Sequence, residues 1–168
     1  MYTMFRKQMI KQILIIILVL GIIPSIALSQ QFEKDTIKLF FLGGQSNMEG
    51  HGKNAELPDA LKKEFNNVWI FQGNPVPDEN ENGGLGTWDV LTPGHGAGFS
   101  SDGNTNKLSN KFGIELSFAK KLQELYPNEK IALIKYSRGG SSLDSLAARE
   151  YGSWEMDYRG TNGVNQLD

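Results

Sequence analysis

A short apolar segment that runs into a glycine-rich turn with a serine constrains the fold of this chain most. Residues 37–42 (IKLFFL) form an apolar run with β-branched and aromatic residues, which predicts a buried β-strand. Gly43, Gly44, Gln45 and Ser46 follow directly. A serine at the carboxyl end of a buried strand lies where open α/β sheets bind their ligands, and glycines allow close backbone approach. The segment therefore predicts an activated serine nucleophile.

The rest of the sequence alternates between predicted strands and helices. Residues 68–71 and 131–134 predict two further buried strands, and residues 114–126 predict an amphipathic helix. The apolar face of this helix would consist of Ile114, Phe118, Leu122 and Leu125. Two shorter helices are expected, at residues 58–65 and, behind a Ser142 cap, at residues 143–150. This order of elements predicts a parallel sheet with helices on its faces.

The first 29 residues predict a secretory signal peptide. Basic residues at positions 6, 7 and 11 precede an unbroken apolar run at 13–23, and Ala27-Leu28-Ser29 supplies a small-x-small cleavage pattern. An uncleaved anchor is the alternative, but the run is short for a span of about 20 residues. We expect cleavage after Ser29, no stable membrane anchor afterwards, and a secreted or periplasmic location. The net charge of −2 provides no basic field for nucleic acid.

Three segments together resemble the sialic-acid-specific acetylesterase and carbohydrate esterase family 6 group, which belongs to the SGNH (GDSL-like) hydrolases. They are GGQSNMEG at 43–50, FGIELSFA at 112–119 and IALIKYSRGGSSL at 131–143. The resemblance implies a three-layer, flavodoxin-like α/β fold with a parallel sheet. It also implies removal of O-acetyl groups from an acetylated carbohydrate, either sialic acid or a xylan-type glycan, without a metal or organic cofactor.

The resemblance also implies roles for individual residues. Ser46 is the nucleophile, and its own backbone N–H is one donor to the oxyanion. A glycine of the later loop is the second donor, and Gly140 matches it best, with Gly139 as the other candidate. Both glycines would otherwise only form a tight turn.

Five other polar or aromatic residues have both a functional and a structural interpretation. Gln45 and Asn47 contact substrate or hydrogen-bond their own turn. Arg138 pairs with a sugar carboxylate or forms a surface salt bridge. Glu115 lies near the active-site loop or favours the dipole of its helix. Trp88, in the long loop expected at 73–101, stacks on sugar or fixes the loop.

The catalytic base of the family has no counterpart in this sequence. In the family, a histidine lies near the C-terminus in an Asp-x-x-His arrangement, whereas the only histidines here are His51 and His95. We therefore expect a fragment, in which residues 36–168 are the N-terminal portion of a domain truncated at its C-terminus. The alternatives are a catalytically inactive carbohydrate-binding remnant, and an enzyme that uses His51 or His95 as base. Otherwise both histidines are ordinary surface loop residues.

Overall fold

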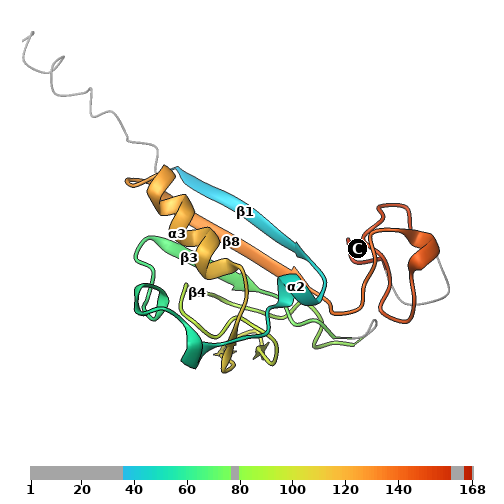
Figure 1. The fold of residues 1–168 in the computed structure, drawn as a ribbon. Helices are drawn as coiled ribbons and strands as arrows, with labels where there is room; N and C mark the ends of the chain where they lie inside the picture. The colour runs from blue at the N-terminus through green and yellow to red at the C-terminus, as the bar shows by residue number, and fades with distance from the viewer. Residues whose placement is uncertain (1–35, 77–79, 160–164, 168) are drawn as a thin grey trace, which may run out of the picture. The chain divides into compact units, whose positions relative to one another are not determined.

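The structure is a computed structural model that describes residues 36–76, 80–159 and 165–167. Its centre is a four-stranded sheet in the order β1-β8-β3-β4 (Figure 1). The strands are β1 (Ile37–Gly44), β8 (Lys130–Ser137), β3 (Val68–Gln72) and β4 (Trp88–Val90). The first three run parallel and β4 is antiparallel. The structure thus confirms a mixed α/β fold with a mostly parallel sheet. The predicted signal peptide, residues 1–29, lies outside the described residues.

The pairing of β1 with β8 brings two distant turns together. The register runs from Ile37 opposite Lys130 to Gly44 opposite Ser137. The pairing continues one residue further, because the N–H of Arg138 donates to the carbonyl of Gly44 at 2.9 Å. Since parallel strands end at the same edge of a sheet, the turn after β1 lies beside the turn after β8.

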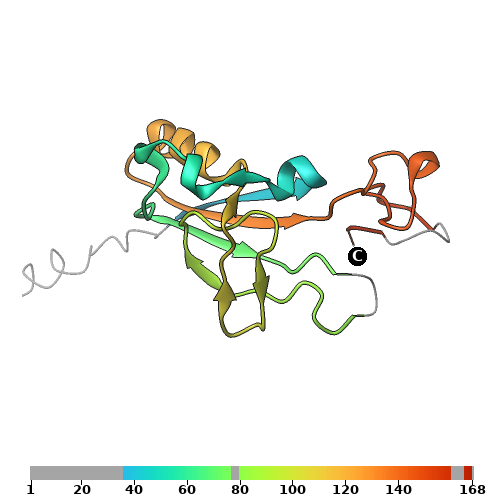
Figure 2. The same ribbon diagram turned by 60° about the horizontal axis from the view of Figure 1, so that its bottom comes forward.

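One face of the sheet is covered by α3 (Glu115–Leu125), as Figures 1 and 2 show. The buried core there includes Ile70, Leu116 and Leu133, and Phe40 meets Phe118 edge to face at 5.7 Å. Apolar contact on this face holds the helix against the strands.

The buried side of α3 differs from the predicted one. The helix buries Glu115, Leu116, Ala119 and Leu122. Ile114 and Leu125 are 48% and 58% exposed, so the predicted apolar face is wrong at two of its four positions. Ile114 precedes the helix and Leu125 is its last residue, whereas Glu115 points inward to a buried lysine, described below.

The other face of β1 is exposed. Leu39 and Phe41 are 59% and 58% exposed, and Ile37 is 52% exposed. The prediction of a buried strand is therefore wrong for the side chains on this face. The three-layer arrangement stays a prediction.

The remaining elements are short. They are α2 (Ser46–Glu49), β2 (Gly52–Lys53), η1 (Asn54–Glu56), η2 (Asp59–Leu61), β5 (Ser100–Ser101), β6 (Asn106–Lys107), β7 (Lys111–Phe112) and η3 (Ser145–Ala147). Strand β2 pairs with β7, and β5 pairs with β6. None of the helices in the described ranges is long and apolar enough to cross a membrane.

Two predicted helices are reduced to single 3₁₀ turns. Residues 58–65 form only η2, with Pro58 at its N-cap. Residues 143–150 form only η3, whose cap is Asp144 and not Ser142, because the Asp144 side chain accepts from the N–H of Leu146 at 2.9 Å. Trp88 also departs from its prediction, since it lies on β4 and not in a loop.

Candidate functional site

Ser46 is the first residue of α2, immediately after the strand β1. The side chain of Gln45 shapes this turn, because its Oε1 accepts from the backbone N of Ser46 at 2.8 Å and from Ser46 Oγ at 2.5 Å. The carbonyl of Gln45 also accepts from the N–H groups of Met48 and Glu49. Gln45 thus has the structural role of capping α2. Its amide oxygen is hydrogen-bonded to both the hydroxyl and the backbone N–H of Ser46, the two groups that the predicted chemistry requires.

The loop after β8 lies against the Ser46 turn. A Cβ atom built on Gly139 would lie 3.9 Å from Ser46 Cβ and 3.1 Å from Glu49 Oε2. Gly140 has φ of +82°, and a Cβ there would lie 2.5 Å from Cδ2 of Tyr151. The structure therefore brings Gly139 next to Ser46 and places Gly140 one residue away, beneath an aromatic ring.

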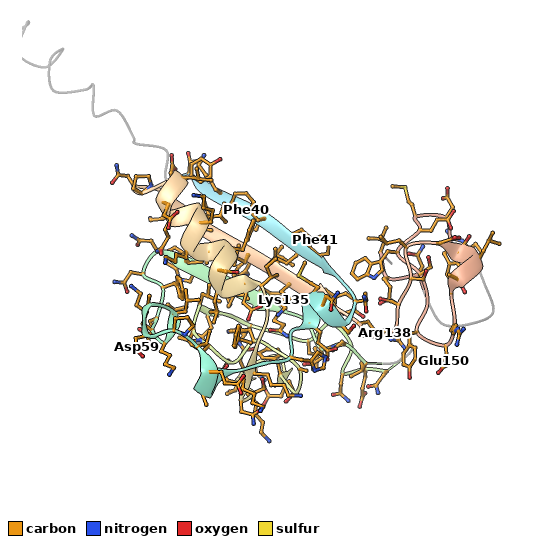
Figure 3. The ribbon with its side chains drawn as sticks, viewed as in Figure 1. Phe40, Phe41, Asp59, Lys135, Arg138 and Glu150 are labelled. Atoms are coloured by element: carbon orange, nitrogen blue, oxygen red, sulfur yellow. The ribbon has the colours of Figure 1, made fainter. Side chains whose placement is uncertain are left out.

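The other predicted site residues are split between surface and interior. Asn47 is exposed on α2 beside Ser46. Arg138 is only 8% exposed, at the end of β8 (Figure 3), so it is not the surface group that an ordinary salt bridge would need. Trp88 lies on β4, at the edge of the sheet opposite β1.

A buried lysine that the sequence interpretation missed lies beneath the turn that carries Ser46. Lys135 Nζ is 2.7 Å from Glu115 Oε2, and neither side chain is exposed. The ammonium also donates to the carbonyl oxygens of His95 at 2.6 Å and of Glu49, the last residue of α2, at 3.1 Å. All three of its donors are used. Figure 3 shows Lys135 on β8 next to α2.

Glu115 completes this network. Its Oε1 accepts from the N–H of Gly113 at 2.7 Å, while its other oxygen meets the ammonium. Glu115 was predicted either to lie near the active-site loop or to favour the dipole of its helix. In the structure it pairs with the buried Lys135, whose ammonium also binds the last residue of α2. The sequence already indicated this burial, because Lys135 lies on the same face of its strand as the apolar residues Ile131 and Leu133.

His95 is buried, so the interpretation as a surface loop residue is wrong for it. Its Nδ1 lies 3.0 Å from Gln72 Oε1, and its ring stacks on Phe99 at 5.2 Å. Burial, and then the charge of Lys135, lower the pKa of His95 to about 3. The residue is therefore neutral at pH 7 and packs as part of the interior.

His51 is exposed and lies 3.8 Å from Glu49, measured from Nε2 to Oε2. The Ser46 hydroxyl donates to Gln45, and neither histidine is hydrogen-bonded to it within the described structure. Among residues 36–76, 80–159 and 165–167, no three His, Asp or Glu side chains are grouped as metal ligands would be.

One known protein family matches most of the described chain. The family described as "Carbohydrate esterase, sialic acid-specific acetylesterase" matches residues 36–159. The chain belongs to this family. The match confirms the resemblance drawn from the three sequence segments, and it extends beyond them at both ends.

Two solved structures are similar to this family member. One is a carbohydrate acetylesterase from Xanthomonas citri, with 21% identity and a TM-score of 0.38, covering 64% of this chain and 23% of the other. The second is NanS, with 18% identity and a TM-score of 0.42, covering 74% of this chain and 41% of the other. The chain therefore spans less than half the length of either relative. Among curated proteins, none matches the chain.

The buried ion pair predicts an asymmetric response to mutation. Lys135→Met leaves the Glu115 carboxylate buried without its partner, which costs about 3–5 kcal/mol of unfolding free energy. The double variant Lys135→Met/Glu115→Leu replaces both charges and is expected to recover part of this loss. Urea unfolding measures both. The control Lys121→Met breaks the exposed Lys121–Glu124 pair and is expected to change little; a Lys135→Met protein as stable as this control would contradict the prediction.

His95 predicts acid sensitivity. The unfolded chain binds a proton at this residue near pH 6.5, whereas the folded chain binds it only near pH 3. The contribution of neutral His95 to the unfolding free energy is thus complete above pH 6.5. It is lost as the pH falls from 6.5 toward 3, by about 1.4 kcal/mol per pH unit. In His95→Asn, whose amide replaces Nδ1, the unfolding free energy is expected to fall less steeply between pH 7.5 and 4.5. The exposed control His51→Asn should keep the wild-type slope; identical slopes in all three proteins would refute the assignment.

The two glycines of the loop after β8 are expected to differ in tolerance. Gly140→Ala places a side chain at φ +82° and against the Tyr151 ring, which costs about 1–3 kcal/mol. Gly139→Ala meets mainly the mobile end of the Glu49 side chain and is expected to cost less. Thermal unfolding of the two variants tests this order, and equal melting temperatures would contradict it.

Proposed function

We propose that this chain is the nucleophile-bearing portion of a secreted or periplasmic carbohydrate O-acetylesterase. One observation carries the proposal: Ser46 stands on a tight turn at the carboxyl end of β1, with Gly139 of the neighbouring strand's loop beside it. This arrangement supports a partly exposed serine next to a glycine loop that has no side chain at this point. Family membership supports the ester and carbohydrate parts of the proposal.

In the proposed reaction, Ser46 Oγ attacks the acetyl carbonyl carbon while its proton passes to a base. The resulting oxyanion is held by the N–H of Ser46 and by the N–H of Gly140, with Gly139 as the alternative second donor. The sugar hydroxyl leaves with the proton, and the acetyl group stays on Ser46. Water then attacks this acyl-enzyme, releases acetate and restores the hydroxyl.

The proposed base is a His/Asp pair from polypeptide outside these 168 residues, so residues 36–168 would be the N-terminal part of the domain. Two findings support this. His95 is buried and bonded to Gln72, and His51 is exposed and faces Glu49. Cleavage of a signal peptide at residues 1–29 would deliver the protein to the proposed location.

The proposed substrate is an acetylated sialic acid or a xylan-type glycan. Asn47 is the better supported substrate contact, because it is exposed next to Ser46. The burial of Arg138 argues against direct binding of a sugar carboxylate. The amide oxygen of Gln45 is bonded to Ser46, so a substrate contact through that oxygen would require its release from Ser46.

A second candidate function is carbohydrate binding without turnover. The observation in its favour is that the Ser46 hydroxyl bonds to Gln45 and to neither histidine. Sugar binding in the absence of ester hydrolysis and of serine labelling would favour this candidate.

Ser46→Ala tests the proposal directly, in the longer protein that would also supply the proposed His/Asp base. Hydrolysis of an acetylated xylan oligosaccharide is expected to fall about 10³-fold or more, because the nucleophile is removed. A fluorophosphonate probe, which labels activated serines, is expected to label the wild-type protein and not the variant. The matched control is Ser117→Ala on the exposed side of α3, which should retain both properties. Hydrolysis and labelling that are equal in Ser46→Ala and Ser117→Ala would rule out the serine mechanism.

A further inference from the structure

An aromatic ring lies directly on the loop that borders Ser46. Tyr151 packs against Gly140 so closely that a Cβ there would lie 2.5 Å from Cδ2 and 2.9 Å from Cγ of the ring. The residue is nevertheless 43% exposed. One side of the ring thus rests on bare backbone, and a large part of it is open to solvent.

The backbone that carries Tyr151 is tied to the same loop. The N–H of Ser142 donates to the carbonyl of Gly152 at 3.0 Å, and the N–H of Trp154 donates to the carbonyl of Ser142 at 2.7 Å. The Trp154 indole also donates to Ser141 Oγ at 2.9 Å. On the other side, Gln166 Nε2 donates to the carbonyl of Tyr151 at 2.7 Å. These bonds fix the ring relative to the loop after β8.

The ring lies one residue away from the contact with the nucleophile. Gly139 faces Ser46, and Gly140 carries the ring. Consecutive Cα atoms are about 3.8 Å apart, so the ring contacts the loop about one residue away from the point where the loop faces Ser46. An aromatic body with a polar tip suits a sugar, whose C–H groups form an apolar face and whose hydroxyls lie around the rim.

Other aromatic residues are less suited to this role. Trp88 is 48% exposed and contacts Phe71 at 5.8 Å, but β4 lies three strand positions from β1, a lateral distance of about 14 Å. Trp154 is half-buried between Phe41 and Tyr136, and its indole N–H is used by Ser141.

We propose that Tyr151 is a carbohydrate-binding residue, which stacks on the pyranose ring whose acetyl ester reaches Ser46. This inference rests on the proposed function, because it takes the substrate of that site to be an acetylated sugar. It gives Gly140 a second role, since only a glycine allows the ring to lie flat on the loop. It also moves the expected sugar contact from Trp88 to the side of the sheet that carries the nucleophile.

Binding measured without turnover tests this inference. The probes are acetylated xylotriose and 9-O-acetyl-N-acetylneuraminic acid, titrated by calorimetry into the full chain that carries Ser46→Ala. Adding Tyr151→Ala is expected to weaken the binding of at least one probe about three- to tenfold, the loss of one stacking contact. Adding Tyr151→Phe, which keeps the ring, is expected to change the affinity less than twofold.

Tyr126→Ala is the matched control. Tyr126 is 36% exposed and contacts Lys38, whose Nζ lies 4.6 Å from its ring centroid, at the opposite end of the strands. This change is expected to leave the affinity unaltered, and circular dichroism verifies that each variant is folded. The inference is overturned if Tyr151→Ala binds as well as its parent, if Tyr126→Ala weakens binding equally, or if neither probe binds the Ser46→Ala parent.

The two proposals fail in different ways. The titrations use protein without the nucleophile, so their result does not depend on whether Ser46 reacts. If binding depends on Tyr151 while hydrolysis and labelling are independent of Ser46, the serine mechanism is wrong and the sugar site stands. If Ser46 reacts but Tyr151→Ala binds normally, the esterase proposal stands and this inference is wrong.

Discussion

The turn that carries Ser46 is joined to the interior through one buried ammonium. Lys135 has no exposed surface, and a buried charge is tolerated only when its donors are paired. Its three partners come from α3, from the end of α2 and from the His95 segment. These segments are distant in sequence. The ammonium therefore ties the last residue of α2 to α3 and to the His95 segment, while Gln45 caps the start of α2 at Ser46.

The second constraint is the parallel register of β1 and β8. It sets Gly44 opposite Ser137, so the two turns that follow start at the same level. Both turns contain glycines, and backbone can therefore approach backbone where side chains would collide. Lys135 lies on β8 two residues before its end, beneath the turns that the register aligns. The strand register and the Lys135 contacts thus both position the turn that carries Ser46.

Local sequence predicted the parts of this structure that depend on local patterns. The strands at 37–42, 68–71 and 131–134 and the turn at Ser46 follow from apolar runs and glycines, and all are present. The exposed face of β1 did not follow, because whether a sheet face is covered depends on segments distant in sequence. His95 was expected on the surface as an ordinary loop residue, yet it contacts Gln72 and Phe99 in the interior. The helix expected at 143–150 is only a 3₁₀ turn capped by Asp144, and the flanking Ser142 pairs with the distant Ser153.

The amide of Gln45 is hydrogen-bonded to both the hydroxyl and the backbone N–H of Ser46. One oxygen atom accepts from both the hydroxyl and the backbone N–H of the serine. A single rotation of the Gln45 side chain would therefore release the hydroxyl and the backbone N–H of Ser46 at the same moment. In the conformation described, the hydroxyl proton of Ser46 is hydrogen-bonded to Gln45 Oε1. A molecule that fills the site and displaces this amide would open both groups together.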